Sequence, residues 1–600
     1  MVDAGSTRGP IEDCGRGPVK DRAVGPVTRY SFGSVKRYAR GSIEDYALLW
    51  WLVIVVAVLS VLPLARLVLE GIAPGGTLST EALRRVLSSP TTWTATGHSL
   101  ATALGGTLLA VVIGVTVALV VSLTDFRHRN AYIFCFVMPL LLAAQVVALA
   151  WLQLFGPSSS LLKMLGVAPS LGSRNPLYSA WGIILVLGIQ YSPLVFLTLR
   201  AGLRTLPQEL IEAGLSGGAG PLKVMRTIVL PLMTPPILAG VALCFVSCLG
   251  NFGIPALLGI PGNYVVLPTL IYQRLAGLGP SALSEVAVLS VLIGFIALIG
   301  IVAQDALLSR RDFRISTASM VARPFELRRW HLAVELGLWI LSFVVLALPL
   351  LALVLTSLVP AVGVPLNFAT ATLDNYRFVL FEHAAAKRAL VNSFGLSATA
   401  AIVIVLLAIP LAYFLVWRRS RLLRVINLIT EMPYALPGVV LAIAAILLFL
   451  KPLPILGVSI YNTIWIILFC YLARFLVLGL RPVISGYHQL DRTLEEAAQI
   501  AGARLLRRLR TIILPLVAPA AAAGALLIFL TAFNELTVSA LLWSSGSETL
   551  GVVFFSFQQG GDSTYAAALG VLTVIVSVAL MLSTLLMAGR LPPGVLPWRD

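Results

Sequence analysis

Charged side chains are scarce in this chain. Asp, Glu, Lys and Arg make up 12% of its 600 residues, whereas soluble domains carry about 25%. Hydrophobic residues make up 58%, and the mean hydropathy is +0.94. A water-soluble fold cannot bury so much apolar surface. The composition therefore excludes a soluble protein and predicts that lipid surrounds part of the chain.

Cysteine is also rare, with five residues in the whole chain. Four of them lie in apolar stretches, where a thiol acts as a small hydrophobe. Cys244 and Cys248 are four residues apart and share a helix face, as a metal or redox pair would. A core role is favoured because no His or carboxylate flanks them. Neither a disulfide framework nor a metal site is expected.

The phosphate-binding loop of ATPases is missing as well. Its pattern G-x-x-x-x-G-K-[ST] requires a Gly-Lys pair, and the chain contains none. ATP hydrolysis is therefore not expected of this chain, and we assign it no catalytic residue and no cofactor.

Long apolar runs, by contrast, are abundant. A helix needs roughly 20 apolar residues to cross hydrocarbon, and each run must be helical because lipid offers the backbone no hydrogen-bond partner. Pro139, Pro433 and Pro437 are expected either to kink or to end spans. The sequence predicts an all-α polytopic membrane protein of about twelve transmembrane helices, at 46–69, 98–122, 131–155, 179–200, 233–257, 284–306, 331–357, 390–417, 425–450, 460–481, 517–542 and 564–588.

The net charge of +17 would suggest nucleic acid in a soluble protein. Here the basic residues gather in alternate loops and are not interleaved with aromatic residues that stack on bases. This alternation follows the positive-inside rule and predicts that both termini are cytoplasmic. Residues 1–45 are expected to be a disordered cytoplasmic tail, and 589–600 a short C-terminal tail.

One polar segment occurs twice. "EAGLSGGAGPLKVMRTIVLPLMTP" begins at Glu212 and "EAAQIAGARLLRRLRTIILPLVAP" at Glu496, a spacing of 496 − 212 = 284 without a gap. An earlier stretch repeats at a spacing of 294, so the third connection between spans should be ten residues shorter in the second half. Six spans per half make the halves parallel repeats. The expected domains are 46–306, a cytoplasmic linker at 307–330, and 331–588.

Each copy reads as a helix, a glycine break and a second helix, at about 205–235 and 489–519. Thr493 followed by Glu496 predicts a capping box at the start of the second copy. Gly218 and Gly502 permit a sharp bend or a close backbone approach. A loop that only fixed topology would need the basic residues but not the gapless register. We therefore interpret the loops as rigid contacts for a soluble partner.

The two copies resemble the EAA loop of binding-protein-dependent ABC importer permeases of the type I fold. That pattern is Glu-Ala-Ala, three residues, Gly, and Ile-x-Leu-Pro about ten residues later; the first copy departs from it at Gly214. The resemblance implies that the loops are coupling helices that dock on an ATPase subunit. The coupling residues would be Glu212, Ala213, Gly218, Ala219, Glu496, Ala497, Gly502 and Ala503.

The same resemblance implies partners and a place in the cell. A homodimeric ATPase would bind ATP and Mg in the cytoplasm, and an extracytoplasmic binding protein would deliver the substrate. This chain would supply both permease halves in the bacterial inner membrane. The segments that begin "NFGIPALL" at Asn251 and "FNELTVSA" at Phe533 look most like the ferric-iron branch. Branches that carry thiamine, polyamines or aminoethylphosphonate are the alternatives.

Polar side chains inside spans are costly and by default suggest function. Asn251 and Glu535 are equivalent in the repeat and can face one another across the pseudo-two-fold axis, as a gate or a substrate contact. Hydrogen bonds between helices, or a salt bridge from Glu535 to Arg474, are equally common uses. The candidates for the translocation path are Asn251, Asn534, Glu535, Gln145 and Arg474.

Two other classes of protein compete with this interpretation. A secondary transporter driven by an ion gradient would need titratable groups within the membrane, and the chain has few of them. A membrane scaffold or sensor would not require duplicated docking loops.

Overall fold

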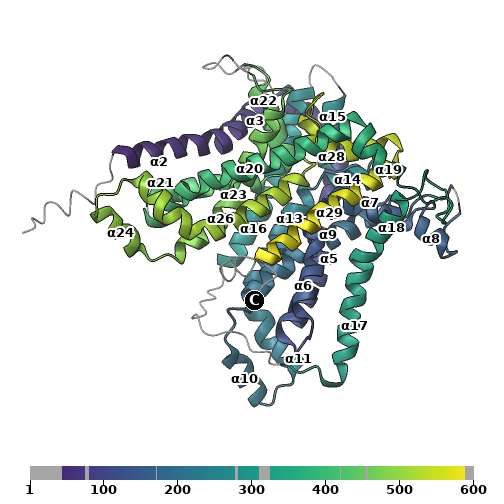
Figure 1. Cartoon of the computed structure of the whole chain (residues 1–600), viewed down its shortest axis with the longest axis horizontal. Helices are drawn as coiled ribbons and strands as arrows, with labels where there is room; N and C mark the ends of the chain where they lie inside the picture. The colour runs from purple at the N-terminus through teal and green to yellow at the C-terminus, as the bar shows by residue number, and fades with distance from the viewer. Residues whose placement is uncertain are drawn as a thin grey trace, which may run out of the picture. The chain divides into compact units, whose positions relative to one another are not determined.

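Helices form every regular element in the part of the chain that the structure describes (Figure 1). The structure is a computed structural model that describes residues 43–587 except 74–79, 171, 278–281, 310–324, 419, 453–456 and 458. Both predicted tails fall outside it, apart from residues 43–45. Within the described residues the single strand-like pairing is a bridge between Thr124 and Phe325. The all-α prediction is confirmed.

The chain divides into two units, Met1–Ala47 and Leu48–Asp600. Of the first unit the structure describes only residues 43–47, which begin a helix. The packing described below belongs to the second unit.

Nine helices in the described residues are long and apolar enough to cross a membrane, and the number reaches twelve if each of three bent pairs is one span. The prediction of about twelve spans is therefore met only when the bent pairs are included. The bent pairs are Arg129–Leu141 with Ala144–Met164, Pro221–Leu232 with Thr234–Gly250, and Arg421–Ala435 with Gly438–Phe449.

The first half contains the elements from α2 to α16. They are α2 (Ile43–Val56), η1 (Ala57–Val61), α3 (Leu62–Ile72), α4 (Glu81–Ser88), α5 (Pro90–Leu123), α6 (Arg129–Leu141), α7 (Ala144–Phe155), α8 (Ser160–Met164), α9 (Ala180–Leu203), α10 (Gln208–Ser216), α11 (Pro221–Val224), η3 (Met225–Val229), α12 (Leu230–Leu232), α13 (Thr234–Gly250), α14 (Gly253–Leu258), α15 (Leu267–Ala276) and α16 (Ala282–Ser309).

The second half repeats this order. Its elements are η4 (Arg328–Trp330), α17 (His331–Ser342), η5 (Phe343–Ala347), α18 (Leu348–Ser357), α19 (Asp374–Arg377), η6 (Phe378–Glu382), α20 (Ala384–Trp417), α21 (Arg421–Ala435), α22 (Gly438–Phe449), α23 (Ile464–His488), α24 (Arg492–Ile500), α25 (Leu505–Arg508), η7 (Leu509–Ile513), α26 (Leu514–Phe533), α27 (Ser539–Leu542), α28 (Leu550–Gly560) and α29 (Ser563–Met587).

The element boundaries reproduce both repeat spacings. Helices α5 and α20 have 34 residues each. Their starts differ by 384 − 90 = 294, whereas the starts of α9 and α23 differ by 464 − 180 = 284. The spacing changes in the connection from α7 to α9 and in its equivalent from α22 to α23. This connection covers 156–179 in the first half and 450–463 in the second. The predicted ten-residue shortening of the third connection is confirmed.

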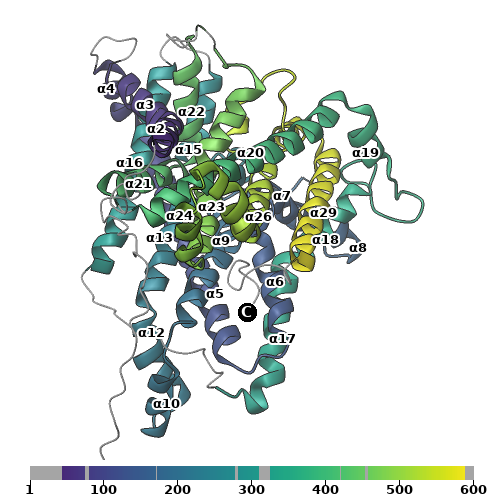
Figure 2. The ribbon, with the colours of Figure 1, turned by 60° about the vertical axis from the view of Figure 1, so that its left-hand side comes forward.

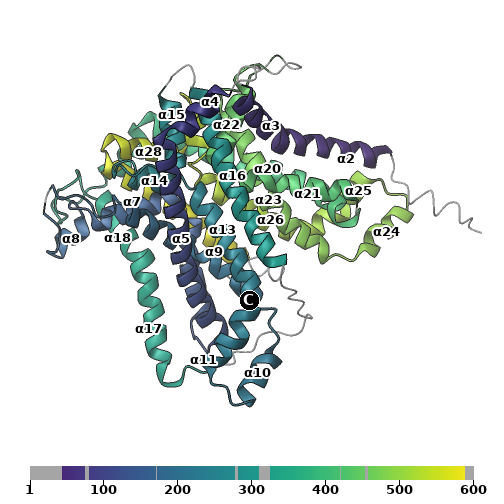
Figure 3. The ribbon, with the colours of Figure 1, turned by 180° about the vertical axis from the view of Figure 1, so that it is seen from behind.

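The first helix of each half packs against the other half. Helix α3 lies against α22 as well as α16, and η1 contacts α21 and α23. In return α18 packs on α7 and α8 of the first half as well as on α29, and α17 contacts α6 (Figure 3). The two sequence halves are therefore interlocked rather than packed as two separate bundles.

Proline sets a recurring irregularity in these helices. Four of the five π-helical turns in the described residues, namely η1, η3, η5 and η7, end two residues before a proline. The residue four positions before each proline is the middle of the π turn. A proline ring clashes with the carbonyl at that position and donates no hydrogen bond to it. The prolines are Pro63, Pro231, Pro349 and Pro515.

The long helices carry apolar stripes on their outer faces. Leu104, Leu108 and Val112 on α5 follow one another at a spacing of four residues and are 59%, 67% and 57% exposed. Exposed apolar stripes of this kind mark surfaces that lipid covers. Cys244 and Cys248 of α13 are buried with their sulfurs 3.9 Å apart, as expected for core thiols.

Candidate functional site

The two copies of the repeated segment share their first three helical elements, whereas the helix that follows is bent by 65° at Met233 in the first copy and continuous in the second. Helix α10 is followed by α11 and η3, and helix α24 by α25 and η7. The first and last residues of α24, α25 and η7 each lie 284 residues after those of α10, α11 and η3, as in 492 − 208 = 284. Figure 2 shows α10 and α24 as short helices at separate places on the protein. Each leads back into a long membrane helix.

A left-handed glycine follows each short helix. The φ angle is +82° at Gly218 and +81° at Gly502, a region that residues with a Cβ rarely adopt. The next amide, of Ala219 or Ala503, donates to the carbonyl five residues back at 3.1 and 3.0 Å, which is the Schellman pattern. A Cβ added at either glycine would meet no atom within 4 Å. The glycines therefore serve the turn, and the alternative of a close backbone approach is wrong within this chain.

The starts of the two short helices differ. The predicted capping box of Thr493 and Glu496 is wrong, because Asp491 is the N-cap residue and accepts a hydrogen bond from the Thr493 amide at 2.9 Å. Hydrogen bonds from the backbone and hydroxyl of Thr493 lower the pKa of Asp491 below its ordinary value. Pro207 occupies the corresponding position before α10. Of the two copies, the second alone has a side-chain cap.

The predicted coupling residues lie at or near the surface. Leu222 is 82% exposed beside them, and its equivalent Leu506 is 72% exposed. Apolar side chains so exposed at the same position of two polar loops indicate a surface that a protein partner covers. The exposed coupling residues are Glu212, Ala213, Gly218, Glu496, Ala497 and Gly502, whereas Ala219 and Ala503 are half-buried.

A buried polar cluster supports the second loop. Glu495 of α24 and Arg508 of α25 form an ion pair and are 4% and 3% exposed. The hydroxyl of Tyr413 in α20 donates to the same carboxylate at 3.0 Å. These three residues therefore fix α24 against a membrane helix and against the segment that follows it.

The first loop has an apolar version of the same cluster. Leu119, Ile211 and Val224 occupy the positions of the tyrosine, the glutamate and the arginine, and the last two are fully buried. This exchange was not predicted from the sequence. Comparing the two copies for pairs that change from charged to apolar together would have found it.

Two predicted spans, 131–155 and 425–450, are broken rather than continuous. The angle is 101° at the break after α6 and 105° between α21 and α22. The breaks fall at the equivalent positions 142–143 and 436–437, with the same spacing as the starts of α5 and α20. Pro437 explains the second break, because it has no amide hydrogen and disfavours helix at the residue before it.

Side-chain amides bind the peptide groups that the first break leaves free. Gln190 of α9 donates to the carbonyls of Pro139, in the last turn of α6, and of Leu142, in the break, at 2.7 and 3.3 Å. Asn534, just after α26, donates to the Leu141 carbonyl at 3.1 Å, and Gln145 donates to the backbone carbonyl of Asn534 at 3.3 Å. Such partners are required where lipid supplies none. The structure thus brings Gln145 and Asn534 together across the two halves.

The end of α13, in the first half, in turn contacts the break between α21 and α22 in the second half. A Cβ added at Gly250 would lie 3.1 Å from the Cα of Pro437. The last turn of α13, in the first half, therefore packs against the second break. Each break is covered by a helix end from the other half.

Two further predicted spans end earlier than expected. Helix α13 ends at Gly250 and helix α26 at Phe533, whereas the predicted spans were 233–257 and 517–542. The polar residues predicted within those spans consequently lie just past a helix end. There the side chains of Asn251 and Glu535 accept hydrogen bonds from amides at the starts of α14 and α27.

Asn251 and Glu535 do not contact each other in the described structure. Asn251 donates to the Tyr191 hydroxyl and accepts from a backbone amide of α14, both at 2.9 Å. Glu535 accepts from the amides of Val538 and Ser539 at 2.7 and 3.2 Å. Each side chain is thus held within its own half.

Arg474 of α23 lies beside the second break. Its Cζ would be 2.9 Å from a Cβ added at Gly438, the first residue of α22, so the guanidinium lies directly against the start of that helix. Among the described residues no ion pair within 4.0 Å joins Arg474 to Glu535, and its Nη1 is buried there without a hydrogen-bond partner. The alternative of a salt bridge between these two residues is therefore wrong.

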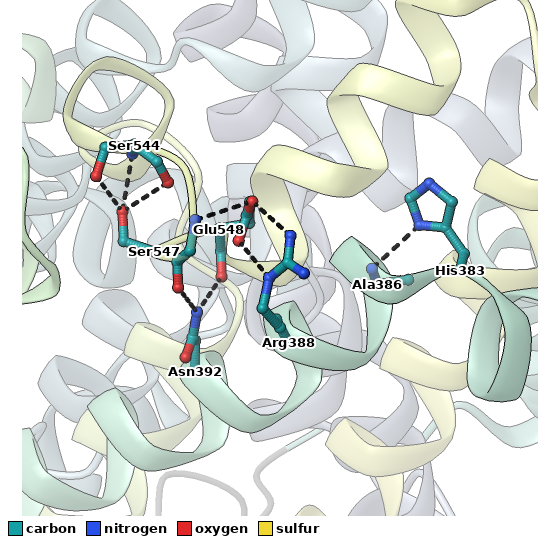
Figure 4. Close-up of polar contacts among 8 residues, drawn as sticks. His383, Ala386, Arg388, Asn392, Ser544, Ser547 and Glu548 are labelled. Carbon is teal, nitrogen blue, oxygen red and sulfur yellow. Dashed lines mark hydrogen bonds and ion pairs between the residues drawn. The ribbon is translucent and has the colours of Figure 1, made fainter.

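Another polar cluster ties the start of α20 to the loop before α28 (Figure 4). Arg388 contacts the Glu548 carboxylate with two nitrogens, at 3.0 and 3.3 Å. Asn392 donates to the carbonyls of Gly546 and Glu548 at 3.1 and 2.9 Å. The Arg388 hydrogen bonds hold the pKa of Glu548 below its ordinary value. This cluster and Tyr413 lie at opposite ends of α20, a helix long enough to cross a bilayer.

Comparison with known proteins gives one family for both halves. The profile described as binding-protein-dependent transport system inner membrane component matches residues 110–312 and 404–597. These ranges contain both short loop helices and both breaks.

Two curated relatives are similar over most of the chain, and a third is similar over part of it. A probable ABC transporter permease protein of Sinorhizobium fredii is 28% identical over 502 residues, covering 82% of this chain and 86% of that protein. A ferric transport system permease protein of Actinobacillus pleuropneumoniae is 26% identical over 470 residues, 76% of this chain and 66% of that protein. The match thus spans just under two thirds of the ferric permease. A putative 2-aminoethylphosphonate transport system permease protein of Salmonella typhimurium is 28% identical over 233 residues, 38% of this chain and 81% of its own length.

Proposed function

Because this chain belongs to the family of binding-protein-dependent transport system inner membrane components, we propose that it forms the complete two-half channel of an ATP-driven importer. It is a multi-pass, all-α membrane protein of the ABC permease family. The observation that carries the proposal is the pair of loops around α10 and α24. They share one structure at two equivalent positions and expose the same apolar residue, as docking on two identical motor subunits requires.

The proposed partners lie on opposite sides of the bacterial inner membrane. A homodimeric ATPase, with ATP and Mg bound to it, docks on the α10 and α24 loops, through the eight coupling residues predicted there. An extracytoplasmic binding protein delivers substrate at the other side, where the Arg388–Glu548 cluster lies. The distribution of basic loops supports this orientation, with both chain termini in the cytoplasm. This chain itself carries no cofactor in the proposal.

The proposed translocation path runs along the broken helices. Helix ends from one half cover the breaks of the other half there, so rocking of the halves would open or close the passage. Polar groups at membrane depth line cavities or pathways more often than they face lipid. The residues proposed for the path remain Gln145, Asn251, Asn534, Glu535 and Arg474.

Ferric iron is the proposed cargo, on the strength of the similarity to the ferric transport permease. Aminoethylphosphonate is the second candidate, since a relative of that description is also similar; thiamine and polyamines rest on the sequence resemblance alone. The described residues hold no group of three or more His, Cys, Asp or Glu side chains arranged for a metal.

Reconstitution in liposomes tests this function. The chain is combined with the ATPase and the binding protein encoded beside it, and ATP hydrolysis and uptake of radioactive iron are measured together. We expect both rates to rise when iron-loaded binding protein is added, and uptake to persist when ionophores collapse ion gradients. Uptake that follows an ion gradient and ignores ATP would indicate a secondary transporter. Stimulation by loaded phosphonate-binding protein instead of the iron-loaded one would reassign the cargo.

The two turn glycines test the docking role. Valine at 218 and 502 would force a β-branched side chain into a left-handed turn and place it on the exposed face, so we expect ATP hydrolysis to lose its link to uptake. Asparagine tolerates this backbone region and gives a matched control for added bulk alone. We expect G218V/G502V to reduce iron uptake at least tenfold while the chain still inserts in the membrane. Unchanged uptake in the valine variant would contradict the docking role.

A further inference from the structure

A groove of about 850 Å³ lies where the ends of α20, α21 and α23 meet in the second half. This volume is near the upper end of the range for small-molecule sites. Four basic side chains line it, Arg421, Arg424, Arg481 and His488. The groove lies at the same ends of α20 and α23 as the α24 loop, on the side where the basic loops gather.

The charges in the groove are only partly compensated. Arg481 pairs with Glu431. Arg421 and Arg424 are exposed, and in the described residues no ion pair engages either guanidinium. They lie in the first turn of α21, whose N-cap Ser420 accepts from a backbone amide at 3.2 Å. The positive end of the helix adds to the two arginine charges, so the groove favours an anion.

Aliphatic side chains make the rest of the groove apolar. Leu415, Leu423 and Ile484 line its walls. Leu428 also lines it and is 65% exposed, and Val425 on the same helix is 51% exposed. The apolar surface therefore continues from the basic end along the outer face of α21, at the level of the membrane. A small free anion would leave this surface uncovered.

In the described residues of the first half, the positions equivalent to the groove lining are filled by buried side chains. The positions equivalent to Leu415, Ser420 and Asn427 hold Val121, Phe126 and Ile133, each at most 1% exposed. Trp339 of α17 packs against the same hydrophobic cluster and lies edge-on to Tyr132, at 5.6 Å between ring centroids. The groove is therefore a property of the second half and not a general consequence of the repeat.

We propose that this groove binds one anionic phospholipid. The head group lies between Arg421 and Arg424, and the acyl chains follow Leu428 along α21. Basic pockets between membrane helices on the cytoplasmic side are suited to anionic head groups, and each arginine near the surface contributes substantially to such binding. The inference depends on the membrane location of the chain and not on the cargo or the motor.

Native mass spectrometry of the purified full chain in detergent tests the site. Phosphatidylglycerol, cardiolipin, phosphatidylcholine and inorganic phosphate are added separately. We expect one tightly held phosphatidylglycerol or cardiolipin per chain, and about tenfold or more weaker binding in R421Q/R424Q. R127Q is the matched control, because Arg127 holds the position equivalent to Arg421 in the first half; it should bind as the parent does. I484F keeps all charges but fills the groove, and it should also weaken binding.

Three results would overturn the proposal. Equal binding of anionic lipid by the parent and by both groove variants would place the lipid elsewhere. Equal affinity for phosphatidylcholine would make the groove a general apolar surface. Displacement of the lipid by millimolar phosphate would make it a site for free anions. Thermal melting of each variant without added lipid confirms that the variants are folded.

Discussion

At the scale of single residues, the two halves fill the space behind the short loop helix with different side chains. Behind α24, Glu495 and Arg508 neutralise each other, and Tyr413 completes the cluster. Behind α10, Ile211 and Val224 fill the same space with apolar side chains. A buried ion pair balances the cost of desolvation only while both charges are present. The second loop therefore depends on a pair, whereas the first depends on packing.

Substitutions of this pair give the first stability prediction. Arg508→Ala leaves a buried carboxylate unpaired and should destabilise the protein by about 3–5 kcal/mol. The double variant E495I/R508V gives these two positions the residues of the first loop, leaves only the Tyr413 hydroxyl without its partner, and should be less destabilised than Arg508→Ala. Unfolding in mixed micelles, read as a double-mutant cycle, measures both. Equal losses in the single and double variants would show that the charge pairing is not what matters.

The Arg388–Glu548 contact gives a prediction for pH. The folded-state pKa of Glu548 lies below its ordinary value. The contact therefore stabilises the fold above the ordinary carboxyl pKa of about 4.3, and this contribution is lost as pH falls through the lowered pKa. E548Q should melt at a lower temperature than the parent at pH 7, and the difference should shrink below about pH 4. A difference that stays constant with pH would exclude the carboxylate charge as its origin.

At the scale of elements, the helices were predictable where local sequence decides them. Apolar runs give the spans, and the two gapless copies give α10 and α24 the same bounds. The breaks were not predictable in the same way. The run at 131–155 is as apolar at Leu142 and Ala143 as elsewhere, and the partners of that break include Asn534, which is distant in sequence. A single-span prediction follows from composition, while the break follows from tertiary hydrogen bonds.

For the candidate site, too, local sequence predicts which residues stand out but not which residues they contact. The predicted coupling residues follow from a repeated local pattern; six of the eight are exposed, and Ala219 and Ala503 are half-buried. The residues predicted for the path were chosen because polar groups stand out in apolar runs. Their partners were not predicted, since Asn251 and Glu535 accept hydrogen bonds from helix starts of their own halves instead of meeting. Sequence equivalence fixes corresponding positions but not contact between them.

The prolines that follow the π turns give a prediction for element geometry. Pro515→Ala restores an amide donor and allows the turn η7 to become α-helical. Removing one π insertion should rotate α24 and α25 by about 100° relative to α26. Distances between spin labels on α24 and α26 would report the rotation. Pro519→Ala is the control, because Pro519 lies within α26 without a π turn before it, and it should leave these distances unchanged.

At the scale of the whole molecule, the halves are interlocked by their first helices. Helix α3 buries one face on α22, and α18 buries one on α7. Neither half has its full set of contacts alone. The protein therefore needs both halves to complete its packing, although each half is a repeat of the other.

Splitting the chain tests this interlock. If the chain is cut between Ser309 and Phe325, the two fragments should assemble and copurify when they are made together. Each fragment alone should be degraded or aggregate, because a helix face made for the other half stays uncovered. A first fragment that lacks residues 43–72 should copurify with the second much less efficiently. Stable, monodisperse single fragments would contradict the interlock.

The exchange of first helices also bears on how the protein is made. Helix α22 begins 438 − 72 = 366 residues after α3 ends, so a ribosome adding about 5–20 residues per second reaches it roughly 20–70 s later. During that time the face of α3 that packs on α22 in the folded protein lies in the bilayer without this neighbour. Its Arg66 and Glu70 form an ion pair with each other at 2.9 Å. The nascent helix thus brings its own counter-charge and can remain inserted until the rest of the chain arrives.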